Sequence, residues 1–143
     1  MARILLNYLD VKILIVDDDK LIRWALQEIC VSEGHDVTAV AMPESASQEA
    51  ENGSYDIIFV DMETEAIDAE TIIEKLKVHQ PKASVILLSS RTRQEIERLL
   101  NDIAIYGIVG KPFEASLIRS FIDRIRDRKR ERGTHPHWIL NCR

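Results

Sequence analysis

The chain has 143 residues, of which 45% are hydrophobic and 30% are charged, a balance typical of one globular domain with its own core. No apolar run approaches the roughly eighteen residues of a membrane span, and the first ten residues lack a signal-peptide pattern, so we expect neither a transmembrane helix nor a signal peptide in this sequence. The net charge of −5 is uneven: residues 123–143 hold seven Lys/Arg and three Asp/Glu, a net of +4, so residues 1–122 sum to −9.

Five short apolar runs, rich in β-branched residues, predict five strands. They span residues 11–16, 37–40, 56–60, 84–88 and 105–109. The runs are apolar on both faces instead of alternating with polar residues. This pattern indicates parallel strands that are covered by helices on both sides.

Segments with a helical spacing of apolar residues alternate with these strands. The clearest apolar stripes run over 21–30, 72–76, 96–100 and 117–125, and a weaker helix over 43–52 begins at Pro43 and ends near Gly53. This alternation predicts an α/β fold: a doubly wound, five-stranded parallel sheet of the flavodoxin-like order 2-1-3-4-5 with five helices. We expect one domain over 11–132, an N-terminal extension over 1–10 and a C-terminal tail over 133–143.

Polar residues follow four of the five predicted strands, where an open α/β sheet forms its sites. They are Asp17 and Asp18 after the first strand, Asp61 after the third, Ser89 and Ser90 after the fourth, and Lys111 with Pro112 after the fifth. In the predicted strand order these side chains converge on one acidic pocket with a hydroxyl and an ammonium group on its rim. Three carboxylates and a lysine suit a hard cation such as Mg²⁺, which could in turn hold a phosphoryl group.

The segments "ILIVDDD", "YDIIFVD", "VILLSS" and "GKPF" occur in this order, each at the end of a predicted strand. In this the chain resembles the receiver domain of two-component response regulators over roughly residues 11–130. The resemblance implies that Asp61 accepts a phosphoryl group from the phosphohistidine of a sensor histidine kinase or a phosphotransfer protein. Asp19 is left over from the acidic run, and we expect it to cap the first helix.

The resemblance also implies the roles of the other residues of the pocket. Asp18 and Asp61 would bind Mg²⁺ directly, together with the backbone carbonyl of Glu63, while Asp17 would act largely through water. Lys111 would face the phosphoryl oxygens, and Ser89 would donate its hydroxyl to one of them. Ser90 is small enough to leave the phosphoryl position accessible, and the Lys111–Pro112 peptide bond is expected to be cis.

The chain departs from the family pattern at several positions. Glu65 stands where the family usually has proline, and Asp68-Ala69 replaces the usual Asp-Gly pair, so the loop after the third strand should differ in shape. Ile108 replaces the aromatic switch residue, and Tyr106, two positions earlier, is expected on the same side of the strand. Glu63 and Arg91 flank the pocket and could pair across it, which would obstruct a hydrolytic water.

We expect a signalling protein, not an enzyme that turns over an outside substrate, although it takes part in its own phosphoryl transfer and dephosphorylation. Its signal would leave through protein contacts of the region 92–130, and both a phosphorelay intermediate and a homodimer are compatible with the sequence. A degenerate receiver that binds partners without phosphorylation is the alternative. A phosphatase of the haloacid dehalogenase type is disfavoured, because Glu63 stands where that family needs aspartate.

The last helix and the tail suggest no further site. Acidic residues interleave with the basic ones of the segment "RIRDRKRER" at four-residue spacing, which is typical of a solvated helix, so we do not expect nucleic acid contact. His135, His137 and Cys142 lack a recognised metal-ligand spacing. The two cysteines, Cys30 and Cys142, lie far apart and predict no disulfide framework, which suits a bacterial protein of the cytoplasm.

Overall fold

The computed structural model describes residues 10–63, 69–100 and 103–133 and contains a five-stranded parallel sheet. The strands run in the order β2-β1-β3-β4-β5, which confirms the predicted fold. Their bounds are β1 Lys12–Val16, β2 Asp36–Val40, β3 Ile57–Asp61, β4 Ser84–Ser89 and β5 Gly107–Gly110. All strands point the same way, so their carboxyl ends share one edge of the sheet.

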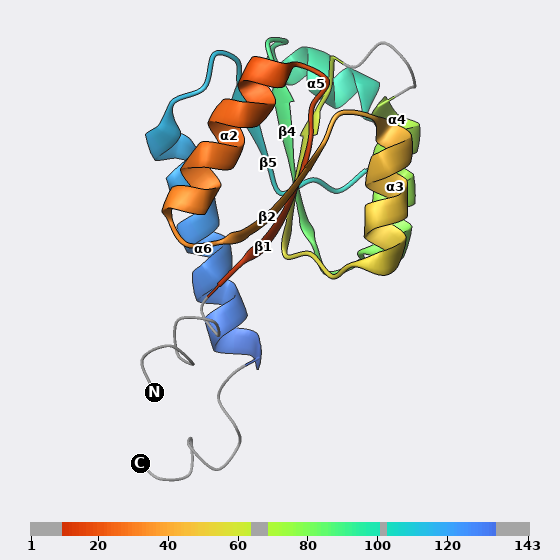
Figure 1. The fold of residues 1–143 in the computed structure, drawn as a ribbon. Coiled ribbons are helices and arrows are strands. Elements are labelled where there is room, and N and C mark those ends of the chain that lie inside the picture. Colours follow the sequence, from red (N-terminus) through yellow and green to blue (C-terminus); the bar gives the residue numbers. More distant parts are fainter. Residues whose placement is uncertain (1–9, 64–68, 101–102, 134–143) are drawn as a thin grey trace, which may run out of the picture.

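Helices cover both faces of the sheet, as the apolar strands require. Helices α2 (Lys20–Ser32) and α6 (Ala115–Gly133) lie on one face, and α3 (Pro43–Asn52), α4 (Ala69–His79) and α5 (Arg93–Leu99) lie on the other (Figure 1). A hydrophobic core lies on each face of the sheet, and successive side chains of β1 point alternately into one core and the other. Ile13 and Ile15 pack toward α2 and α6, and Leu14 and Val16 pack toward α3, α4 and α5. No helix within the described ranges is both long and apolar enough to cross a membrane.

The first two helices begin where the sequence predicts. Asp19 is the N-cap of α2, and its carboxylate accepts hydrogen bonds from the main-chain N of Leu21 (2.9 Å) and Ile22 (3.2 Å). Pro43 is the first residue of α3, and Gly53 follows its last. The predicted apolar stripe of α2 is wrong at Leu21, which lies in the first turn of the helix and is 77% exposed, whereas Leu26 and Cys30 are buried.

Strand β5 begins at Gly107, two residues later than predicted. The ring of Tyr106 packs edge-on against Phe121 of α6, with ring centroids 6.0 Å apart, whereas Ile108 packs toward α4 and α5. The prediction that these two residues share one side of the strand is therefore wrong, because Tyr106 precedes the regular strand and escapes its alternation. Gly107 lies directly under Phe121: a Cβ at this position would be 2.5 Å from the Phe121 Cε1 atom.

Gln80 secures the loops at the amino edge of the sheet. This buried side chain donates from Nε2 to the carbonyl oxygens of Ala50 and Gly53, both at 2.7 Å, and its Oε1 accepts from the Tyr55 main-chain N at 3.0 Å. One amide group thus pairs with three main-chain groups, one in the last turn of α3 and two in the segment that follows it. A loop held in this way resists local opening, because each freed main-chain group would have to be solvated again.

Two further side chains tie the start of β1 to its surroundings. Asp56 Oδ2 accepts from the Lys12 main-chain N (2.9 Å) and from Lys129 Nζ of α6 (3.0 Å). His35 is buried, and its Nδ1 accepts from the Val11 main-chain N at 3.1 Å. The amino edge is therefore held by polar side chains that bond to main-chain groups.

Candidate functional site

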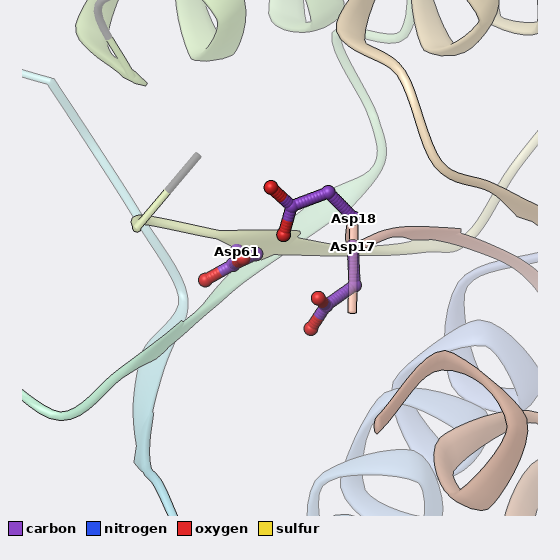
Figure 2. A group of neighbouring side chains, drawn as sticks. All are labelled: Asp17, Asp18 and Asp61. Atoms are coloured by element: carbon purple, nitrogen blue, oxygen red, sulfur yellow. The ribbon is translucent and has the colours of Figure 1, made fainter. Parts of the chain in front are cut away.

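Three carboxylates meet at the carboxyl edge of the sheet. Asp17 and Asp18 follow β1, and Asp61 is the last residue of the adjacent strand β3. Each offers a carboxylate oxygen within 4.8 Å of the others, and Figure 2 shows the Asp17 and Asp18 side chains pointing to opposite sides of the β1 end. Asp17 and Asp61 are buried and Asp18 is exposed, so the group is open to solvent on the Asp18 side.

Lys111 reaches this group from the end of β5. Its Nζ lies 2.9 Å from Asp61 Oδ1 and 3.3 Å from Asp17 Oδ2, and its side chain is only 10% exposed. Burial lowers the pKa of Lys111, but its hydrogen bond to Asp61 and the charges of both carboxylates outweigh burial, so the pKa lies above its usual value. The ammonium is therefore charged at neutral pH. The next peptide bond, Lys111–Pro112, is cis, as the resemblance implied.

Asp17 is a carboxylate whose ionised form is disfavoured by burial. Burial raises its pKa from 3.8 to about 6; the backbone hydrogen bond from Asp19 opposes this rise, and the charge of Asp61 adds to it. Its Oδ1 accepts from the Asp19 main-chain N at 2.9 Å, whereas its buried Oδ2 makes no well-aligned hydrogen bond among the described residues and faces the Lys111 ammonium at 3.3 Å. An incompletely satisfied buried oxygen within a set of carboxylate donors fits a hard divalent cation such as Mg²⁺.

Ser89, Ser90 and Glu63 line the side of the site formed by the ends of β3 and β4. Ser89 is buried, and its hydroxyl oxygen accepts from the Arg91 main-chain N at 3.0 Å. Glu63 donates its main-chain N to Asp61 Oδ1 at 3.0 Å. Its carboxylate accepts from the Ser90 main-chain N at 2.6 Å and from the Ser90 hydroxyl, and these two hydrogen bonds lower the pKa of Glu63.

Glu63 contacts a neighbour that the sequence did not predict for it. The Glu63 carboxylate is hydrogen-bonded to Ser90 instead of ion-paired with Arg91, because both donors of Ser90 face it from the end of β4. The sequence indicated only that Ser90 is small and did not reveal this contact, since no motif signals a hydrogen bond between two loops.

Ile108, which stands at the position of the aromatic switch residue that the resemblance implied, is half-buried in β5.

Several residues singled out from the sequence lie outside the described ranges. Glu65 and Asp68 of the loop after β3 belong to this group, as do His135, His137 and Cys142 of the tail. The site is therefore built from Asp17, Asp18, Asp61, Ser89 and Lys111, together with Glu63 and Ser90. The structure brings together the four charged strand-end residues that the sequence placed in the pocket, Asp17, Asp18, Asp61 and Lys111.

Comparisons with known proteins agree with this arrangement. The family model of the response regulator receiver domain matches residues 13–123. The response regulator protein FleR of Pseudomonas aeruginosa is 24% identical over 115 residues, which cover 79% of this chain and 24% of FleR. The chemotaxis protein CheY of Bacillus subtilis is 27% identical over 116 residues, which cover 79% of this chain and 95% of CheY. The chain thus spans about a quarter of the length of FleR and nearly all of CheY.

Solved structures share the fold. A CheY-like receiver domain protein from Methanospirillum hungatei has a TM-score of 0.79 at 21% identity, with 87% of this chain and 99% of that chain covered. The receiver domain of a sensor histidine kinase from Pseudomonas aeruginosa, which has a magnesium ion coordinated in its active-site cleft, has a TM-score of 0.74 at 21% identity, with 82% and 98% covered. From the match over residues 13–123 we conclude that this chain belongs to the response regulator receiver domain family of two-component systems.

Proposed function

We propose that the chain accepts a phosphoryl group on Asp61 from the phosphohistidine of a sensor histidine kinase or a phosphotransfer protein. The observation that carries this proposal is the buried Asp61 carboxylate, which lies beside two further carboxylates and 2.9 Å from the Lys111 ammonium. A nucleophilic carboxylate needs positive charge close by, because the group it attacks is an anion. Membership of the receiver family supports the same role.

The transfer exchanges one bond to phosphorus for another. A carboxylate oxygen of Asp61 attacks phosphorus, a P–O bond forms, and the P–N bond to the donor histidine breaks with its electron pair going to the imidazole. Lys111 stabilises the negative charge on the phosphoryl oxygens. Ser89, whose hydroxyl can turn from its contact with Arg91, donates a hydrogen bond to one of these oxygens after transfer.

Asp18, Asp61 and the backbone carbonyl of Glu63 would hold a Mg²⁺ ion directly, with Asp17 bound largely through water. When bound, the cation supplies positive charge that offsets the carboxylates and polarises the phosphoryl oxygens. Within the chain itself, the three carboxylates that offer oxygens within 4.8 Å of one another support this assignment. The magnesium ion reported for the related kinase receiver domain supports it from outside.

In this proposal the protein is a cytoplasmic bacterial signalling protein and not an enzyme with an external substrate. It takes part only in its own phosphorylation and dephosphorylation. The signal leaves through protein contacts of the region 92–130, within a phosphorelay or toward a downstream target, with or without a homodimer. No contact with membranes or nucleic acid forms part of the proposal.

A degenerate receiver that binds its partner without phosphorylation is the second candidate. One observation favours it: Ile108 stands where the resemblance implies an aromatic switch residue, and it is packed toward α4 and α5. A packed aliphatic side chain has no ring to reorient in response to Asp61. In this second candidate the pocket could still bind ligands while the surface over 92–130 stays unchanged.

A titration with beryllofluoride, which imitates the acyl phosphate, distinguishes the two candidates. Amide NMR shifts are followed with and without Mg²⁺ in the wild type, in Asp61→Asn, and in the exposed control Asp36→Asn. We expect Mg²⁺-dependent binding that is lost in Asp61→Asn and kept in Asp36→Asn, with shifts that extend to residues 92–110. Shifts confined to the pocket would favour the degenerate receiver, and an absence of binding would refute phosphoryl acceptance by Asp61.

A further inference from the structure

The Glu63 side chain joins the two loops that flank Asp61. Its Oε1 accepts hydrogen bonds from the main-chain N of Ser90, at 2.6 Å, and from the Ser90 hydroxyl. The Glu63 main-chain N donates to Asp61 Oδ1 at 3.0 Å. Glu63 follows β3 and Ser90 follows the neighbouring strand β4, so this contact bridges the ends of two paired strands.

Ser90 lies at the same edge of the sheet as Asp61, just past the end of the neighbouring strand β4. Leu88 of β4 is the register partner of Asp61, and its carbonyl accepts from the Met62 main-chain N at 2.9 Å. Ser90, two residues after Leu88, therefore lies just beyond the end of β4, next to the end of β3 where Asp61 stands. In the structure both of its donors bind an anionic oxygen, so they already have the position and polarity that an anion requires.

A phosphoryl group on Asp61 would bring new anionic oxygens into this space. Lys111 supplies positive charge from the β5 side, at 2.9 Å from Asp61 Oδ1. On the β4 side the proposed function assigns one donor, the Ser89 hydroxyl; the N–H and O–H donors of Ser90 could serve further oxygens but are engaged by Glu63. A phosphoryl oxygen and the Glu63 carboxylate would compete for the same donors, and their negative charges would also repel one another.

We propose that the Glu63 carboxylate is an internal anion that occupies the donors of Ser90 until a phosphoryl group on Asp61 displaces it. This inference rests on the proposed function of Asp61 and adds a regulation of the same site. The contact restrains phosphorylation, and its displacement separates Glu63 at the end of β3 from Ser90 at the end of β4. An ion pair between Glu63 and Arg91 would instead block water without competing for these donors.

The test compares the affinity for beryllofluoride with Mg²⁺ in the wild type and in Glu63→Gln. The glutamine keeps the shape and one acceptor oxygen but loses the charge, so its hold on Ser90 is weaker. We expect beryllofluoride to bind about threefold to tenfold more tightly to Glu63→Gln. In the protein without beryllofluoride, the amide proton of Ser90 should shift upfield in this variant, because its acceptor is no longer charged.

Two further variants separate occupancy from charge. Glu63→Asp keeps the charge but shortens the side chain by one methylene, so loss of the contact with Ser90 should also tighten beryllofluoride binding. Repulsion by the charge alone predicts no change in this variant. Glu131→Gln removes the same charge at the far end of α6, where solvent and salt screen it, and should bind like the wild type.

The outcomes distinguish this inference from the proposed function. Equal affinities of wild type, Glu63→Gln and Glu63→Asp, together with an unchanged Ser90 amide shift, would overturn the inference and leave phosphoryl acceptance by Asp61 intact. Tighter binding in Glu63→Gln alone would also overturn it, in favour of charge repulsion. No binding of beryllofluoride to any of these proteins would overturn the proposed function, and this inference with it.

Discussion

The two edges of the sheet use polar side chains in opposite ways. At the amino edge, the side chains of Gln80 and Asp56 form hydrogen bonds with main-chain groups and hold the neighbouring loops in place. At the carboxyl edge, Asp17 and Asp61 are buried next to each other and share one lysine. The difference shows that one edge stabilises the fold, while the other keeps charges in positions that are unfavourable for stability and suited to binding a cation and an anion.

The pKa of Asp17 expresses this difference. Burial raises it to about 6, so the folded protein disfavours the ionised form that Mg²⁺ binding requires. Above this pH the ionised carboxylate destabilises the fold relative to the unfolded chain, in which the group ionises near pH 3.8. Hydrogen bonds such as those of Gln80 at the amino edge act in the opposite direction and stabilise the fold.

The largest effect on stability is expected from Gln80→Ala, which breaks the amino edge. Loss of three hydrogen bonds to main-chain groups should lower the free energy of unfolding by about 2–4 kcal/mol, measured by urea unfolding. The affinity for beryllofluoride should not change, because the substitution lies at the opposite edge from Asp61. Gln48→Ala, on the exposed side of α3, is the matched control and should be nearly neutral. A loss of beryllofluoride affinity in Gln80→Ala would show that the two edges are energetically coupled.

A smaller effect, of opposite sign, is expected from Asp17→Asn at the carboxyl edge. Without Mg²⁺ at pH 7 the substitution removes a buried charge and should raise the free energy of unfolding by about 1–2 kcal/mol. The same substitution should weaken the Mg²⁺-dependent binding of beryllofluoride. Asp36→Asn, which removes an exposed charge, is the control for both measurements. If Asp17→Asn destabilised the protein, the description of this edge as unfavourable for stability would be wrong.

The smallest effect concerns His35, which sharpens the contrast because it is a titratable group at the amino edge. Its Nδ1 accepts from the Val11 main-chain N, so the folded protein needs the neutral imidazole. Burial lowers the pKa of His35 below 6.5, and the positive charge of Arg126 lowers it further, while three acidic residues raise it and partly oppose the shift. The acidic residues are Asp10, Glu33 and Asp123. Below pH 6.5 the unfolded chain therefore binds more protons, and stability should fall as the pH falls.

Urea unfolding at several pH values between 7 and 5 tests this expectation. In His35→Gln, the amide oxygen can accept from the Val11 main-chain N without titrating. The urea concentration at the midpoint of unfolding should therefore fall less steeply in this variant than in the wild type as the pH is lowered. His79→Gln is the control, because His79 lies at the end of α4 and contacts Glu51 at 3.6 Å. Parallel pH profiles of wild type and His35→Gln would exclude His35 as the source of the pH dependence.

The sequence predicts the fold and the composition of the site for one physical reason. Parallel strands gather their carboxyl ends at one edge, so Asp17, Asp61 and Lys111 could be placed together from strand order alone. Two kinds of detail were not predictable. The exposure of Leu21 and the turn of Tyr106 toward α6 depend on where a helix or strand begins relative to its neighbours. The hydrogen bonds between Glu63 and Ser90 depend on the distance between two loops.

The close approach of Gly107 to the ring of Phe121 has a consequence for sequence variation. A side chain at position 107 would need the space that the ring fills, since even a Cβ would be 2.5 Å from Cε1. Positions 107 and 121 should therefore covary among closely related sequences: a larger residue at 107 would accompany a smaller one at 121. Gly107→Ala alone should destabilise the protein, and pairing it with Phe121→Leu should recover part of the loss.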